Sequence, residues 1–117
     1  ESIEKEIRDY FVYEIDESVI GCVRLTPLTG SAMVELGSVF VQPAYQGRNI
    51  GKALVDYAIE EARKRGAEGV FALTTQAVPF FKKVCGFSEA SIEDLPTVLA
   101  ETLRKSGRNS RIFLLKF

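Results

Sequence analysis

The chain has 117 residues, of which 46% are apolar and 26% are charged, and its formal net charge is −1. This length suits one domain with a single core, so we predict one domain over residues 1–117. A near-neutral charge argues against a nucleic-acid partner, because neutralising many phosphates needs a clear basic excess. No apolar run approaches the about 20 residues of a membrane helix, and the charged start does not resemble a signal peptide. We therefore expect a cytoplasmic protein without a membrane partner.

Histidine is absent from the sequence. This excludes Ser–His and Cys–His nucleophile pairs and histidine-ligated metal sites. The two cysteines, Cys22 and Cys85, form no CxxC pair, so the sequence predicts no metal site. We interpret Cys22, which lies in an apolar run, as a small core residue. Any general base must then be a carboxylate, a tyrosine, a lysine or a water held by such groups.

The first third of the chain predicts a helix end followed by three strands. Ile3 and Ile7 stand four residues apart, which fits the last turns of a helix over residues 2–8. Three stretches rich in β-branched and apolar residues then predict strands: Phe11–Ile15, Val19–Leu28 and Met33–Val41. Because the connections are short, these strands should form an antiparallel meander.

A long amphipathic helix is predicted from Ile50 to the natural C-cap Gly66. Its apolar face is expected to hold Ile50, Ala53, Leu54, Tyr57, Ala58 and Ala62. The apolar stretch Gly69–Thr75 follows as a strand. A strand, a helix and a strand in this order form a βαβ unit, so the strands on either side of the helix should be parallel.

The last third predicts two helices and two strands. They are a short helix over Pro79–Val84, a strand over Phe87–Ala90, a helix over Asp94–Lys105 and a closing strand over Ser110–Phe117. The second of these helices should bury Leu95, Val98, Leu99 and Leu103. Together the elements predict an α/β (α+β) fold with a mixed sheet.

The loop Gln42–Asn49, between the third strand and the long helix, carries the strongest chemical signal. Gly47 allows a tight turn, and Gly51 lets the backbone pass close to a bulky ligand. Arg48 and Lys52 add positive charge beside the free N–H groups of a helix start, which suits a phosphate or pyrophosphate. Taken alone, the glycine spacing fits better with a turn that only caps a helix.

Residues Gln46–Gly51 resemble the Gln/Arg-x-x-Gly-x-Gly/Ala signature of the GNAT superfamily of acetyltransferases, with Asn49 in place of its first glycine. Asparagine tolerates a left-handed backbone better than most residues. The resemblance implies a mainly antiparallel sheet whose parallel βαβ pair carries a coenzyme A site, and a chain that lacks the superfamily's first strand and helices. It also implies acetyl-CoA as co-substrate and no metal. The residues implied for coenzyme A are Val39, Phe40, Val41, Gln46, Gly47, Arg48, Asn49, Ile50, Gly51 and Lys52.

A narrower resemblance covers nearly the whole chain. Leu73-Thr74-Thr75, Asp94-Leu95-Pro96 and Arg108-Asn109-Ser110-Arg111 are similar to the acetyltransferase domain of bacterial-type N-acetylglutamate synthase. This implies transfer of acetyl to the α-amine of L-glutamate, at the start of arginine biosynthesis. It also implies Arg108 and Ser110 as ligands of the substrate carboxylates. Without the resemblance, the same residues would be a solvated basic turn. The sequence does not decide whether the chain forms a homodimer.

The reaction needs a base, an oxyanion donor and, optionally, a general acid. Glu35 is the candidate base, acting through a water; a surface carboxylate at a strand edge is the alternative. The resemblance implies that a backbone N–H within Val39–Val41 binds the oxyanion. The tyrosine that many superfamily members place before Gly86-Phe87 is missing here, and Thr75 is a weak substitute that otherwise simply ends a strand. Arg24 is a further cation, which faces either the acceptor groove or solvent.

Two other functions stay open at this point. One is a GNAT acetyltransferase for a different small amine or for a protein N-terminus. The other is a coenzyme-A-binding domain without catalysis, which the missing tyrosine and the substituted Asn49 would explain.

Overall fold

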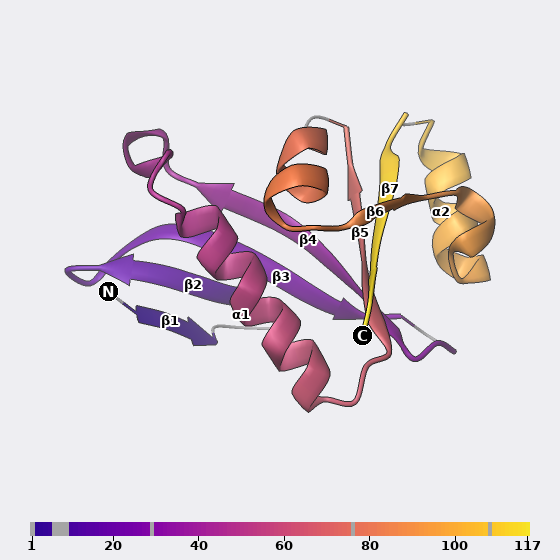
Figure 1. The fold of residues 1–117 in the computed structure, drawn as a ribbon, viewed down its shortest axis with the longest axis horizontal. Coiled ribbons are helices and arrows are strands. Elements are labelled where there is room, and N and C mark those ends of the chain that lie inside the picture. Colours follow the sequence, from indigo (N-terminus) through magenta and orange to yellow (C-terminus); the bar gives the residue numbers. More distant parts are fainter. Residues whose placement is uncertain (1, 6–9, 29, 76, 108) are drawn as a thin grey trace.

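The computed structural model describes residues 2–5, 10–28, 30–75, 77–107 and 109–117, and within these ranges one seven-stranded sheet runs the length of the molecule (Figure 1). The strand order is β1-β2-β3-β4-β5-β7-β6. The strands are β1 Ser2–Lys5, β2 Tyr10–Ile15, β3 Ser18–Pro27, β4 Met33–Val41, β5 Gly69–Thr74, β6 Ser88–Ala90 and β7 Arg111–Lys116. All neighbours are antiparallel except β4 and β5, which are parallel. The predicted meander, parallel pair and mixed fold are confirmed.

The predicted helix end at the start of the chain is wrong, since Ser2–Lys5 forms β1 and pairs with β2. Residues 6–8 of that prediction lie outside the described residues. A segment this short cannot pay the entropic cost of nucleating a helix by itself. The edge of β2 offers it a row of backbone partners instead.

Helices cover both sides of the sheet. Helix α1, Ile50–Lys64, and the short π-helical turn Phe80–Val84 lie on one side, and α2, Thr97–Ser106, lies on the other (Figure 1). Each side has its own core, because alternate residues of the strands between them point in opposite directions: Val70 and Phe113 belong to the α1 side, and Phe71 and Ile112 to the α2 side. None of the helices in the described ranges is long and apolar enough to cross a membrane.

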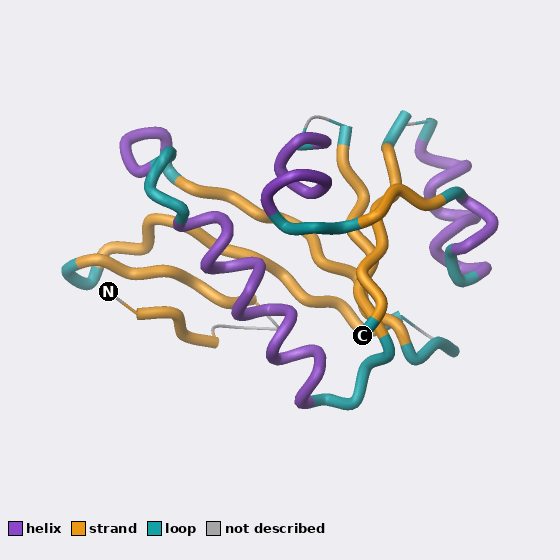
Figure 2. Tube along the Cα trace, in the orientation of Figure 1, coloured by secondary structure: helices purple, strands orange, loops and turns teal. Residues whose placement is uncertain are grey.

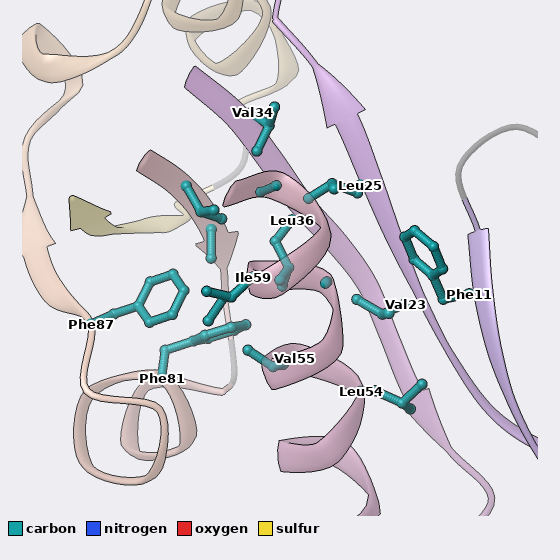
Figure 3. Packing of buried hydrophobic residues seen from close by; sticks show 14 of the residues in the cluster. Phe11, Val23, Leu25, Val34, Leu36, Leu54, Val55, Ile59, Phe81 and Phe87 are labelled. Atoms are coloured by element: carbon teal, nitrogen blue, oxygen red, sulfur yellow. The ribbon is translucent and has the colours of Figure 1, made fainter. Parts of the chain in front are cut away.

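The buried face of α1 is wider than its spacing predicted. Ile50, Leu54, Ala58 and Ala62 are buried as expected, and so are Val55 and Ile59. Figure 3 shows the reason: Phe81, from the Phe80–Val84 turn, packs against this second flank of the helix. Tyr57, predicted on the apolar face, is 38% exposed and stands edge-on to Phe11, with ring centroids 5.3 Å apart.

Helix α2 begins three residues later than predicted. Pro96 is its N-cap, and Leu95 packs into the α2-side core from the turn before the helix. Proline disfavours helical backbone in the residue before it, which sets this boundary. Val98 was predicted to be buried but is 62% exposed, and Ala100 takes the buried position instead.

Strands β4 and β5 separate towards their ends. Their pairing covers only Met33–Leu36 against Gly69–Ala72, after which the two strands diverge (Figure 2). A bulge in β4 accompanies the separation: Cys22 of β3 pairs with Phe40 but Arg24 pairs with Gly37, so Val23 faces two residues instead of one. Bulges bend a strand and increase its twist. The result is a wedge-shaped gap between two parallel strands in the middle of the sheet.

Candidate functional site

A cleft of about 700 Å³ occupies the gap on the α1 side, and we call it the α1-side cleft. Its walls come from β4 beyond the bulge, the loop after β4, the first turn of α1, the end of β5 and the Phe80–Val84 turn. The structure brings most of the residues predicted for coenzyme A to this lining: Val39, Val41, Gln46, Gly47, Asn49, Ile50, Gly51 and Lys52. Phe40 and Arg48 are not in the lining.

The start of α1 presents free backbone donors to this cleft. The first helical hydrogen bond runs from the Ala53 N–H to the Asn49 carbonyl, so the N–H groups of Ile50, Gly51 and Lys52 have no partner inside the helix. Asn49 adopts the left-handed conformation that its place in the signature suggested, with φ of 62°. These N–H groups and the helix dipole create a positive end that favours an anion.

Three polar side chains in the loop and the first turn of α1 have partners within the chain. Gln46 Nε2 donates to the Val41 carbonyl at 3.0 Å, which ties the loop back to β4. Lys52 Nζ pairs with Asp56 at 2.7 Å. The Arg48 guanidinium lies over the ring of Tyr45, 5.2 Å from its centroid. Lys52 therefore lies in the cleft lining as a paired cation, whereas Arg48 lies outside it.

The bulge determines which backbone groups of β4 face the gap. Gln42 N–H donates to the Ile20 carbonyl at 2.8 Å, and Phe40 pairs with Cys22. Hydrogen-bonding direction alternates along an antiparallel strand. The N–H groups of Val39 and Val41 are accordingly turned away from β3 and into the gap.

A second pocket of about 420 Å³, the α2-side pocket, lies on the other face of the sheet. Its lining brings together three residues predicted from the sequence, Arg24, Glu35 and Ser110, and residues of α2 form one of its walls. Gly37, Ser38 and Leu73 line both the pocket and the α1-side cleft, which makes the bulge the place where the two spaces meet.

The α2-side pocket contains a carboxylate and a guanidinium on neighbouring strands. Burial raises the pKa of Glu35 from its ordinary value, and the positive charge of Arg24 opposes part of this rise. Arg24 is half-buried, its guanidinium lies 5.4 Å from the centroid of the Tyr10 ring, and its Nε has no hydrogen-bond partner among the described residues. A buried donor without a partner is costly, so this pocket suits an anionic ligand.

The remaining predicted residues have different outcomes. Thr75 is exposed and lies in the lining of the α1-side cleft. The strand-ending role belongs to its neighbour Thr74, whose Oγ1 accepts the Ala77 N–H at 2.9 Å. Arg108 lies outside the described residues, and its role stays a prediction. Cys22 is half-buried on the face opposite α1 and is not part of either core cluster, so its interpretation as a core residue is wrong.

Sequence reasoning missed Ser38. It has a positive φ of 53° and lies where the two spaces meet. The available signal was the break in alternation, since two residues rather than one separate the inward-facing Leu36 and Val39.

Residues 2–87 match the family model described as the acetyltransferase (GNAT) family. The chain therefore belongs to the acetyltransferase (GNAT) family, which confirms the superfamily resemblance.

Relatives and solved structures agree with this placement. The amino-acid acetyltransferase of Aeromonas salmonicida is 35% identical over 112 residues, which are 96% of this chain and 25% of that protein. N-acetylglutamate synthase from Neisseria gonorrhoeae, solved with coenzyme A and N-acetyl-glutamate, superposes with a TM-score of 0.88 at 30% identity, over 92% of this chain and 25% of that one. Rv2747 from Mycobacterium tuberculosis, in complex with CoA and NLQ, has a TM-score of 0.73 at 25% identity, over 93% and 76%. The chain spans about a quarter of the length of the curated relatives.

Proposed function

We propose that this chain is the catalytic domain of an acetyl-CoA-dependent amino-acid N-acetyltransferase and that its acceptor is L-glutamate. The observation that carries the proposal is the meeting of two spaces at one bulge. One space has a helix start suited to phosphates, and the other has a cation and a carboxylate of raised pKa. The printed names of the relatives and the N-acetyl-glutamate bound by the Neisseria protein support the choice of acceptor.

Coenzyme A fits the α1-side cleft by its chemistry. The free N–H groups at the start of α1 and the Lys52 ammonium offer the donors and charge that a pyrophosphate needs. Val41 turns its N–H into the gap, where the amide-bearing arm of the cofactor would find a partner. The thioester would lie near the bulge, where the α1-side cleft meets the α2-side pocket.

The acceptor, like coenzyme A, fits its space by its charge: the α2-side pocket offers a cation for a carboxylate. Glutamate carries two carboxylates, and arginine can hold a carboxylate through two parallel hydrogen bonds. Arg24 offers a guanidinium whose Nε has no hydrogen-bond partner in the described part of the chain. Ser110 lines the same pocket, and the resemblance adds Arg108.

The proposed reaction is a direct attack. Glu35 accepts a proton from the substrate ammonium through a water. The amine lone pair then forms a C–N bond to the thioester carbonyl carbon, and the C–S bond breaks with the electrons leaving on the coenzyme A thiolate. The second ammonium proton leaves the nitrogen as the amide forms and passes to this thiolate, which gives the free thiol. The Val39 N–H faces the oxyanion that forms between these steps. The thiolate leaves without obligatory help, because a thiol has a solution pKa of about 8.5.

An acceptor panel tests the proposed function. With acetyl-CoA present, we expect the full chain to release free thiol with L-glutamate and not with polyamines, aminoglycosides or peptides. Thiol release with another amine alone would reassign the acceptor. Tight acetyl-CoA binding without release across the panel would instead favour a non-catalytic coenzyme-A-binding domain.

Gly51→Ala tests the coenzyme A site. The added methyl would lie between Phe80 at 3.5 Å and Val41 at 3.8 Å, both in the cleft lining, at ordinary contact distances. The fold therefore tolerates it, and alanine is the better helix former. We expect an unchanged or slightly higher Tm, together with about tenfold weaker coenzyme A binding from the loss of one charge-assisted contact. Calorimetric titration and thermal melts measure the two effects, and equal affinities would mean that the ligand does not approach Gly51.

A further inference from the structure

The bulge of β4 has an unusual residue at its centre. Val23 of β3 faces both Ser38 and Val39, because Cys22 pairs with Phe40 and Arg24 pairs with Gly37. Ser38 has a φ of 53°, a conformation that residues other than glycine adopt at a cost. Such a conformation persists only where surrounding contacts hold it.

A thiol from the neighbouring strand provides one such contact. Cys22 Sγ–H donates to the Ser38 carbonyl oxygen, at 3.4 Å from sulfur to oxygen. A bulge leaves backbone groups outside the regular ladder, and the thiol gives the Ser38 carbonyl a partner within the chain. Burial raises the pKa of the Cys22 thiol, so the group stays protonated and able to donate at neutral pH.

The geometry of the peptide unit links this contact to the gap. The Ser38 carbonyl and the Val39 N–H belong to the same planar trans peptide, so they point in opposite directions and turn together. A thiol on β3 that holds the carbonyl on its own side thereby directs the N–H away from β3. The gap between β4 and β5 lies in that direction.

We propose that Cys22 is a positioning residue, which holds the Ser38 carbonyl and so aims the Val39 N–H at the thioester carbonyl oxygen during acetyl transfer. This inference rests on the proposed function for its effect on rate. Its structural part, the coupling of the thiol to the direction of the Val39 N–H, stands on the contact and the peptide geometry alone.

Cys22→Ala and Cys22→Ser, made in the full chain, test the proposal. Losing a complete oxyanion donor costs about 10²–10³ in kcat, and misdirecting one costs less. We expect Cys22→Ala to lower kcat by about tenfold, with KM for acetyl-CoA and for glutamate within about twofold of wild type. Serine keeps a hydroxyl donor and should restore most of kcat. Val19→Ala, an exposed truncation on the same strand, should keep the wild-type kcat.

A wild-type kcat in Cys22→Ala, or no recovery in Cys22→Ser, would overturn the proposal. If the alanine variant does not fold, Cys22→Thr and Cys22→Val replace the pair, because they differ only in the hydroxyl and both suit a strand. The Val39 amide resonance gives a readout that does not need turnover. It should shift on acetyl-CoA binding in wild type and Cys22→Ser but much less in Cys22→Ala, and equal shifts would again overturn the proposal. A wild-type chain without turnover would refute the proposed function, while the amide shifts would still decide the role of Cys22.

Discussion

Glu35→Gln is expected to lower kcat by about 10²- to 10⁴-fold, the range for loss of a general base, while acetyl-CoA binding stays unchanged. The substituted amide has the shape of the carboxyl but cannot accept the ammonium proton. Glu35 lines the α2-side pocket and not the α1-side cleft, which is why cofactor affinity should not move. Steady-state kinetics and calorimetric titration on the same preparation measure both quantities.

The pH profile sharpens the assignment. Burial raises the pKa of Glu35. The acid limb of the profile, where kcat/KM falls as the pH is lowered, should therefore lie at a pH above about 4.3, the pKa of an ordinary glutamate. In Glu35→Gln this limb should disappear, and the residual rate should rise towards alkaline pH as free amine forms in solution. Glu101→Gln, an exposed carboxylate change on α2, should leave the limb in place. A Glu35→Gln variant that keeps the acid limb would mean that another group is the base.

A carboxyl with a raised pKa also affects stability. Its charged form is disfavoured in the folded state, so a raised pKa costs stability as pH rises through the window between the unfolded and folded pKa values. Glutamine removes this cost. Glu35→Gln should therefore be no less stable than wild type at neutral pH, and lost activity cannot be ascribed to unfolding.

Arg24→Met is expected to raise KM for glutamate by about 10- to 100-fold, which corresponds to the loss of one or two hydrogen bonds to a charged group. Methionine keeps much of the stem volume but removes the guanidinium. The cation is half-buried in the α2-side pocket, and its Nε has no partner in the chain as described. Acetyl-CoA binding should be unaffected, since Arg24 does not line the α1-side cleft.

Two comparisons separate this effect from a general loss of positive charge. Arg104→Met removes an exposed cation from the last turn of α2, outside the pocket lining, and should leave KM for glutamate within about twofold. Arg24→Met should also raise the pKa of Glu35, because the guanidinium now opposes the effect of burial. The acid limb should accordingly move to higher pH. Unchanged KM and an unmoved limb would place Arg24 outside the acceptor site.

The elements that surround the site could largely be predicted from the sequence, because each has strong local patterning. β4 was predicted with the bounds that the structure has, Met33–Val41, and α1 was predicted from its periodicity and its C-cap. The parallel pairing of β4 and β5 followed from the helix between them.

The geometry of the site could not be predicted from local patterning. The bulge at Ser38 shifts the β3–β4 register, and this shift places Arg24 opposite Gly37, on the same face as Glu35. Such a register shift depends on how two strands pair, whereas β-propensity describes the residues of a single strand. The exposure of Val98 depends likewise on where α2 begins, after Pro96, because the start of the helix decides which of its residues face the sheet.

The bulge joins two spaces that open on opposite faces of the sheet, and this has a kinetic consequence for a two-substrate reaction. Each substrate would have its own entrance, so neither needs to arrive before the other. Each product would likewise depart through its own mouth, so coenzyme A would not have to wait for the acetylated amino acid to leave. A compound that blocks one entrance would then lower the maximal rate measured when the substrate of the other entrance is varied. It would not compete with that substrate for binding.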